Sequence, residues 1–315
     1  MSAAPRIDFV VGMSRTGITW LTRALNLHPR LTAFGQSRFW GKHFCAPNDP
    51  RGYDELELAR IHRRLRGFTW DATLGEGPGC LELGLDELRE RIDETWSELR
   101  PPVSPVEAFA ALAGVFARAG GVDHVIEKTP HHVLHVDRIR AHFPRARFVI
   151  IEAQAEDYAA IQRGQPDLHH HPMAVALLFR RYASACERAA DRLGADALRV
   201  QLRALAEDPD RALDPVFRLL DVEPISIATT MPALADAVPF RDPLPIVDRY
   251  WLAQLGGAGS VDGTTPRPSS IELARSLVSL PGWMLGNLRA NLDDVEGSLV
   301  RYYSRWLGSS RLGPR

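Results

Sequence analysis

Short apolar segments alternate with longer amphipathic segments along most of the chain. The composition of β-strands is found at residues 7–12, 124–128, 147–152 and 198–202. The first and third of these are apolar without alternation, as expected for strands covered by helices on both faces. Helical periodicity marks residues 19–27, 85–99, 105–119, 132–142 and 172–193. This order predicts an α/β fold in which helices flank a parallel sheet.

Two parts of the chain depart from this alternation. Residues 34–84 are rich in Gly, Pro, Asp and aromatic residues, with one charged helical piece at 54–66, and we expect a substrate-side excursion there. In residues 225–315 the pattern of strands and helices is less regular at first, and the region ends in two helical segments, 271–290 and 292–307. We therefore expect a single domain over residues 1–315, with 225–315 as its helical C-terminal region.

Charge and cysteine content exclude several classes of protein. The 38 Lys and Arg residues nearly balance 39 Asp and Glu residues, which argues against a nucleic-acid binder with a large basic surface. The chain has no apolar run long enough for a membrane span, and its first apolar run is short for a signal peptide. Cys45, Cys80 and Cys186 are far apart in the sequence, which favours a reducing cytoplasm over disulfides or a zinc site.

The most specific motif follows the first predicted strand. Gly12, Gly17 and Thr19 have the spacing of the phosphate-binding loop G-x-x-x-x-G-K-[ST], with Ile18 in place of the lysine. Such a loop points backbone N–H groups at an anion near a helix N-terminus, and Arg15 adds a cation. Without the lysine the loop suits an ATP or GTP hydrolase poorly. The alternative is an ordinary strand-to-helix turn, but the flanking strand and helix favour anion binding.

Three blocks resemble the sulfotransferases that use 3′-phosphoadenosine 5′-phosphosulfate as donor. Residues 9–29 are similar to their 5′-phosphosulfate loop, 126–151 to their Glu-Lys-Thr-Pro segment and following strand, and 200–224 to a late strand-to-helix segment. The resemblance implies a P-loop-like sulfotransferase fold with a helical C-terminal extension. It also implies sulfuryl transfer to a hydroxyl or amine of a small molecule. Donor-binding residues implied by the resemblance are Arg15, Thr16, Gly17, Ile18, Thr19 and Trp20.

Arg15 is one candidate for catalysis, and Lys128 is the second. The resemblance places it beside the transferring sulfuryl group, where a cation stabilises charge on the bridging oxygen as the S–O bond breaks. Lys42 is the other lysine in a chain with 38 Lys and Arg residues, so a lysine here indicates a need for a compact point charge. A salt bridge to Glu127 is the alternative role for this side chain.

The chain departs from the family pattern at two places. Ala153 and Ile161 stand where the family has the Arg and Ser that hold the 3′-phosphate, and Glu152 adds a negative charge nearby. Gln36 stands where the most similar branch has a Glu that deprotonates the acceptor. An amide cannot take this proton, although it can orient an acceptor. His131, soon after the Lys-Thr-Pro segment, is then the candidate base.

Metal chemistry has weak support in the sequence. The histidines at 131, 132 and 135 and the run at 169–171 have no carboxylate or cysteine at regular ligand spacing, so we expect no metal site. The expected partners are the donor and a small-molecule acceptor.

Three functions agree with these residues. The first is sulfuryl transfer from the usual donor. The second is a repurposed sulfotransferase fold that keeps the anion-binding loop but uses another donor or catalyses a different reaction. The third is a catalytically silent binding protein.

Overall fold

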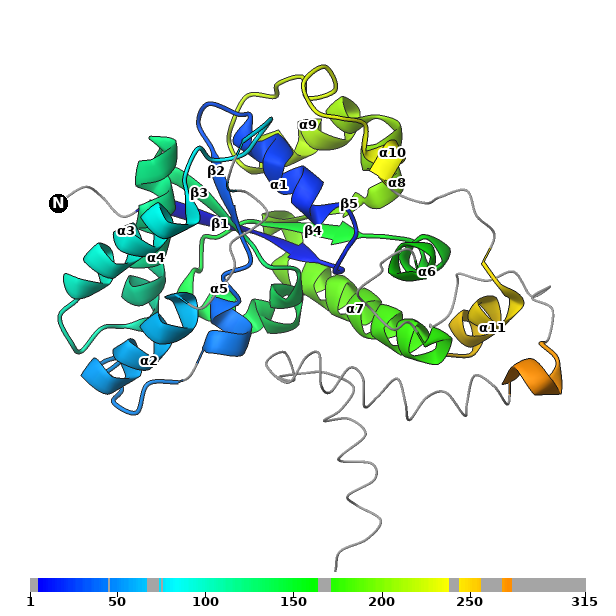
Figure 1. Ribbon diagram of the computed structural model, residues 1–315, viewed down its shortest axis with the longest axis horizontal. Helices are drawn as coiled ribbons and strands as arrows, with labels where there is room; N and C mark the ends of the chain where they lie inside the picture. Colours follow the sequence, from blue (N-terminus) through cyan, green and yellow to red (C-terminus); the bar gives the residue numbers. More distant parts are fainter. Residues whose placement is uncertain are drawn as a thin grey trace, which may run out of the picture. The chain divides into compact units, whose positions relative to one another are not determined.

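The computed structural model describes residues 5–44, 46–66, 74, 76–163, 171–237, 244–255 and 268–273 (Figure 1). The chain divides into two compact units, one with Met1–Glu152 and Ala185–Ala237 and the other with Ala153–Ser184 and Val238–Arg315. The first unit contains the sheet and the phosphate loop. The single domain stays a prediction, and the helices expected at 271–290 and 292–307 lie outside the described residues, except for 271–273.

A parallel sheet of five strands forms the centre of the first unit in the described part of the chain. The strands are β1 (Arg6–Gly12), β2 (Thr32–Gly35), β3 (His124–Lys128), β4 (Phe148–Glu152) and β5 (Ala197–Gln201), in the order β2-β3-β1-β4-β5. In β3 and β4 every residue is buried; β4 is apolar except for Glu152, whereas β3 contains His124, Glu127 and Lys128. The predicted parallel α/β fold is confirmed. The pattern did not reveal β2, a strand of 4 residues that takes in the first residues of the excursion.

Helices cover both faces of this sheet. On one face, the Phe9 ring of β1 lies 5.9 Å from Phe109 of α4 (Pro105–Gly120) and 5.8 Å from Phe143, which follows α5 (Val136–His142). On the other face lie α1 (Ile18–Asn26) and α9 (Pro209–Leu219), where His28 packs 5.5 Å from Phe217. Figure 1 shows α1 and α9 on the opposite side of the strands from α5.

The other elements are shorter or peripheral. In the first unit they are η1 (Phe39–His43), α2 (Glu55–Arg66), α3 (Leu85–Ser97), η2 (Pro130–His135), η3 (Gly194–Asp196), α8 (Leu202–Glu207) and α10 (Leu234–Ala237). The second unit contains α6 (Ala155–Arg163) and α11 (Ile246–Leu255), and α7 (Pro172–Leu193) begins in it. The helix predicted at 132–142 is divided into η2 and α5. No helix among the described residues is both long and apolar enough to cross a membrane.

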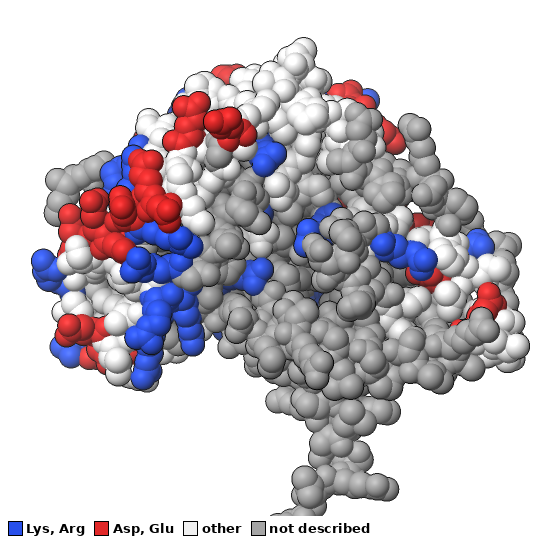
Figure 2. All heavy atoms as spheres, in the orientation of Figure 1, with Lys and Arg blue, Asp and Glu red and all other residues white. Residues whose placement is uncertain are grey.

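The balanced charge of the chain is also visible on its surface. Acidic and basic side chains adjoin one another over α2 and α3, at the left of Figure 2. Ion pairs on α3 join Arg89 to Asp86 at 3.0 Å and Arg91 to Glu87 at 2.6 Å. Exposed pairs of this kind contribute little to stability but leave neither charge unbalanced.

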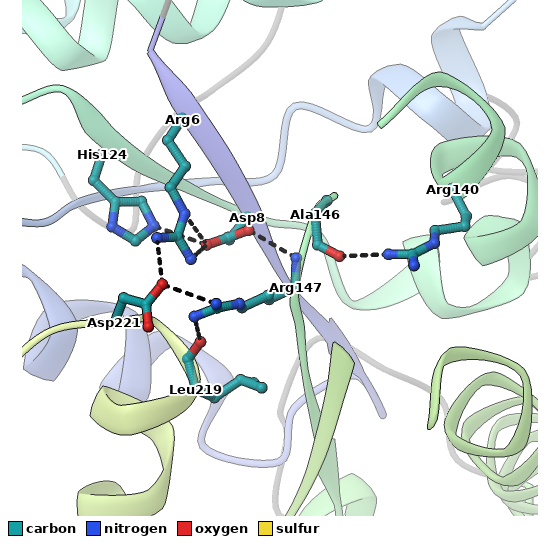
Figure 3. A network of polar contacts seen from close by, with 8 residues as sticks. All are labelled: Arg6, Asp8, His124, Arg140, Ala146, Arg147, Leu219 and Asp221. Carbon is teal, nitrogen blue, oxygen red and sulfur yellow. Dashed lines mark hydrogen bonds and ion pairs between the residues drawn. The ribbon is translucent and has the colours of Figure 1, made fainter. Parts of the chain in front are cut away.

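A buried carboxylate ties together the amino ends of three strands (Figure 3). Asp8 of β1 accepts hydrogen bonds from the backbone N–H of Arg147 at 2.7 Å, from His124 Nε2 at 2.8 Å and from Arg6 Nε at 3.1 Å. Asp221, just after α9, pairs with Arg6 at 3.2 Å and with Arg147 at 2.8 Å. The cluster therefore fixes α9 to the end of the sheet that is remote from the phosphate loop.

Asp8→Asn is expected to lower the free energy of unfolding by about 3 kcal/mol, because it leaves donors facing one another in a buried site. Urea denaturation measures this change. Asp214→Asn is the control, since Asp214 pairs with Arg218 on the surface of α9 and its loss should cost about 0.5 kcal/mol. Equal midpoints for the two variants would contradict a stabilising role for the Asp8 cluster.

Candidate active site

The loop between β1 and α1 has the backbone conformation of an anion cradle. Gly12, Arg15 and Gly17 have positive φ angles of 137°, 69° and 72°. A Cβ atom on Gly12 would lie 2.1 Å from the carbonyl oxygen of Ile151 in β4, so only glycine fits there. Gly17 caps α1 without a side chain, and the first turn contains no acidic residue. The partial positive charge of the first N–H groups is therefore not offset by a capping carboxylate.

The side chains of this loop have different roles. Arg15 is exposed, whereas Thr16 is fully buried and its hydroxyl donates to the carbonyl of Met13 at 2.7 Å. The Trp20 indole N–H donates to the carbonyl of Pro232 at 2.8 Å, which ties α1 to the segment before α10. The side chains of Thr16 and Trp20 thus form hydrogen bonds within the protein. Their backbone N–H groups, with those of residues 17–19, stay candidates for donor binding.

Lys128 ends β3 beside the phosphate loop. It is fully buried and lies in register with Val10 of β1 and Gly35 of β2. Side chains alternate along a strand, and Glu127 lies in register with residues of β1 and β2 that face α4. Lys128 therefore faces the side of the sheet that α1 covers. Because β1 and β3 are parallel, their carboxyl ends lie at the same edge of the sheet, and Lys128 and the phosphate loop are therefore close to each other.

Glu127 is the centre of a buried hydrogen-bond network. Its Oε1 accepts from the Thr129 hydroxyl at 2.5 Å, the Ser37 hydroxyl at 2.7 Å and the Ser37 N–H at 3.1 Å. Its Oε2 accepts from His132 Nδ1 at 2.9 Å. Burial alone would raise the pKa of Glu127, but His132 and the two hydroxyl groups outweigh it, so this pKa is lowered from its ordinary value. Each of the four hydrogen bonds therefore places a donor against an oxygen of Glu127.

The other predicted acceptor-side residues adjoin this network. Gln36 follows β2 and is half-buried; its N–H donates to the carbonyl of Lys128 at 2.5 Å. Its Oε1 lies 3.4 Å from Nη2 of Arg38. His131 is exposed on η2, whereas its neighbour His132 is fully buried. The structure thus brings Gln36 and Lys128 together and leaves His131 open to solvent.

The sequence did not identify Ser37 or Thr129 as site residues, and it offered His132 only together with His131 and His135. Their roles depend in part on partners up to 92 residues away, as for the hydrogen bond from Trp40 N–H to His132. Two adjacent histidines also give no indication of which one is buried.

The negative charge of Glu152 is paired. This residue is 3% exposed and accepts hydrogen bonds from Arg199 Nε at 2.8 Å and Gln201 Nε2 at 3.0 Å. The hydrogen bond to Glu152 raises the pKa of Arg199 and keeps its guanidinium on this carboxylate. The Cys186 thiol lies near the same carboxylate, and its pKa is raised by burial and by this charge. Glu152 therefore has its own internal partners.

Ala153 and Ile161 are both buried in the second unit and offer no side-chain donor. The arginines that could compensate for the missing Arg have structural partners. Arg163 pairs with Asp248 at 2.9 Å, Arg138 donates to the carbonyl of Trp40, and Arg140 donates to the carbonyl of Ala146 at 3.0 Å (Figure 3). Nothing in these contacts replaces the Arg and Ser of the family pattern.

Within the described part of the chain, no three His, Cys, Asp or Glu side chains are grouped as a metal site requires. His169 and His170, two members of the histidine run, lie outside the described residues.

The parallel sheet of five strands with helices on both faces defines an α/β protein, and the glycine loop between β1 and α1 and the buried lysine at the end of β3 lie at the carboxyl edge of this sheet. The chain belongs to the sulfotransferase family, whose sequence model matches residues 8–225. Family membership identifies a transferase and supports sulfuryl transfer in general.

Solved structures similar to the chain share little sequence with it. Sulfotransferase STF9 from Mycobacterium avium is 16% identical, with a TM-score of 0.41 over 89% of this chain and 76% of that one. The sulfotransferase domain of the Synechococcus PCC 7002 olefin synthase is 19% identical, with a TM-score of 0.42 over 88% and 95%. A sulfotransferase from Alicyclobacillus acidocaldarius is 15% identical, with a TM-score of 0.40 over 81% and 96%. No curated protein sequence matches the chain.

Proposed function

We propose that the protein transfers a sulfuryl group from 3′-phosphoadenosine 5′-phosphosulfate to a hydroxyl or amine of a small molecule. The observation that carries this proposal is the position of Lys128. This buried lysine ends the strand next to β1, on the face covered by α1, so it adjoins the loop whose N–H groups can bind an anion. A cradle for a phosphosulfate and a cation for its leaving oxygen are the two groups that sulfuryl transfer requires.

In the proposed reaction, the oxygen or nitrogen of the acceptor attacks sulfur in line with the bridging oxygen of the donor. A new O–S or N–S bond forms while the bond from sulfur to the bridging oxygen breaks, and adenosine 3′,5′-bisphosphate leaves. Arg15 and the N–H groups of residues 16–20 bind the phosphosulfate oxygens. Lys128 stabilises the charge that develops on the bridging oxygen.

The proton of the acceptor is assigned to His131. Its neighbour His132 cannot accept it, because Nε2 of His132 accepts the Trp40 N–H at 3.2 Å and Nδ1 donates to Glu127. His131 is exposed on the same turn, directly after the Lys-Thr-Pro segment. Gln36 orients the acceptor with its amide.

Adenosine 3′,5′-bisphosphate is expected to raise the melting temperature, because a ligand at 100 times its Kd stabilises the folded state by about 2.7 kcal/mol. Thermal-shift measurements with this nucleotide and with adenosine 5′-phosphate test the proposal. Arg15→Ala should remove most of the shift, whereas Arg91→Ala, which breaks an exposed pair on α3, should leave it intact. The proposal fails if neither nucleotide produces a shift at millimolar concentration.

A second function is favoured by the buried, apolar residues Ala153 and Ile161. They supply no side-chain donor for a 3′-phosphate, as expected of a repurposed member that uses another anionic donor. Equal shifts with the two nucleotides would support this second function. A protein that binds the bisphosphate but turns over no acceptor would instead be the silent binding protein.

A further inference from the structure

Consecutive backbone N–H groups fix residues 36–40, which we call the latch segment, to the end of β3 and to η2. The Gln36 N–H donates to the Lys128 carbonyl at 2.5 Å, and the Ser37 N–H donates to Glu127 Oε1 at 3.1 Å. The Arg38 N–H donates to Thr129 Oγ1 at 3.2 Å, and the Trp40 N–H donates to His132 Nε2 at 3.2 Å. The Phe39 N–H donates within the segment, to Ser37 Oγ at 3.2 Å. Arg138 of α5 binds the Trp40 carbonyl at 2.7 Å.

The latch segment has a backbone conformation that it would not keep by itself. Gln36 and Arg38 have φ angles of 53° and 49°, in the left-handed region. This conformation costs a non-glycine residue roughly 1–2 kcal/mol. Residues of this kind persist where the surrounding contacts over-determine them, and they are concentrated at functional sites.

The hydrogen bonds of the latch segment determine the chemical form of Glu127. Because Thr129 Oγ1 and Ser37 Oγ each accept a backbone N–H, their hydroxyl hydrogens are directed to Glu127 Oε1. Because His132 Nε2 also accepts a backbone N–H, the ring proton is on Nδ1 and is directed to Glu127 Oε2. Both oxygens of Glu127 must therefore accept, and among side chains only a carboxylate accepts with two oxygens and donates with neither.

We propose that Glu127 is a positioning residue for sulfuryl transfer, whose carboxylate sets the position of Gln36 on the acceptor side relative to Lys128 on the donor side. Lys128 stands between Glu127 and Thr129, both of which bind the latch segment. The roles of Gln36 and Lys128 in this statement rest on the proposed function. The hydrogen bonds that join the two sides do not depend on it.

Glu127→Gln is the most informative substitution because it keeps the size of the side chain. The amide nitrogen places a new donor against either His132 or the Ser37 N–H, so the latch segment shifts. A displacement of about 1 Å at reacting groups lowers turnover about 100-fold. The KM for the sulfuryl donor should stay near the wild-type value, because the phosphate loop is not altered. The assay is release of adenosine 3′,5′-bisphosphate, with a pool of phenols, alcohols and primary amines as acceptors.

Asp8→Asn is the matched control for this variant. Asp8 and Glu127 are both buried carboxylates that accept a hydrogen bond from a histidine, and both pairs involve β3, but at its opposite ends. Both variants should lose stability. Only Glu127→Gln should lose turnover, measured at a temperature where both proteins are folded.

Hydrogen exchange of the backbone amides gives a readout that needs no substrate. In Glu127→Gln the amides of residues 37, 38 and 40 should exchange at least about tenfold faster, as expected for a locally opened segment, while those of β1 keep their rates. If Glu127→Gln does not fold, Thr129→Val is used in its place, since it removes the acceptor for Arg38 and one donor to Glu127.

Wild-type turnover in a folded Glu127→Gln protein, or equal losses of turnover in Asp8→Asn, would overturn the positioning role. Unchanged exchange in the latch segment would do the same. A wild-type protein that turns over no acceptor contradicts the proposed function and the role of Glu127 in turnover together. Exchange alone then decides whether Glu127 holds the segment.

Discussion

Replacing Lys128 by methionine is expected to lower turnover about a thousandfold, the effect of removing one strong electrostatic stabiliser from a transition state. The side chain is fully buried, and methionine is an unbranched side chain only one heavy atom shorter that removes the charge. A buried ammonium is costly to desolvate, so the free energy of unfolding should stay equal or rise. Turnover, measured by release of adenosine 3′,5′-bisphosphate, and urea denaturation test the two parts.

Lys128→Arg separates the need for a charge from the need for a compact one. A planar guanidinium does not fit a fully buried site shaped for an ammonium, so arginine should not restore turnover. Binding of the bisphosphate to Lys128→Met should persist through the loop and Arg15. Turnover of Lys128→Met within tenfold of wild type would show that Lys128 serves packing rather than catalysis.

The central strands could be predicted from the sequence because they are buried on both faces. The run expected at 7–12 is β1 (Arg6–Gly12), and the run expected at 147–152 is β4 (Phe148–Glu152). By contrast, β2 pairs only with β3 and has 4 residues, too few to show a period. Its place in the sheet is set by pairing with residues 93 positions away, as for Thr32 and Val125.

The candidate site was predictable where chemistry depends on local backbone conformation. The glycine loop requires particular residues at fixed spacing, and Lys128 is conspicuous in a chain rich in arginine. The hydrogen bond of Trp20 could not be predicted, because its acceptor is the carbonyl of Pro232, 212 residues away. Family patterns indicate which residues lie at a site but not which of their atoms are already bonded.

The two glycines of the phosphate loop are expected to respond differently to the same substitution. Gly12→Ala should lower the free energy of unfolding by about 4 kcal/mol or prevent folding, as overpacking and a strained φ combine. Its new Cβ would lie 2.1 Å from the Ile151 carbonyl oxygen, and backbone atoms of β4 cannot move away without breaking the sheet.

Gly17→Ala should fold, because the atoms nearest to its Cβ would be the ends of the Leu202 and Leu234 side chains, at 3.0 Å and 3.1 Å. The strained φ should lower its free energy of unfolding by about 1 kcal/mol. The added Cβ also displaces the first N–H groups of α1, so bisphosphate binding should weaken about tenfold. Gly121→Ala is the control for φ alone, since its φ is 66° and no atom lies within 4 Å of the added Cβ. Urea denaturation and calorimetry with the bisphosphate separate the three variants.

If Gly12→Ala were as stable as Gly121→Ala, contact with β4 would not be the reason for glycine at position 12. If Gly17→Ala bound the bisphosphate as tightly as Gly121→Ala, the start of α1 would not be the anion site.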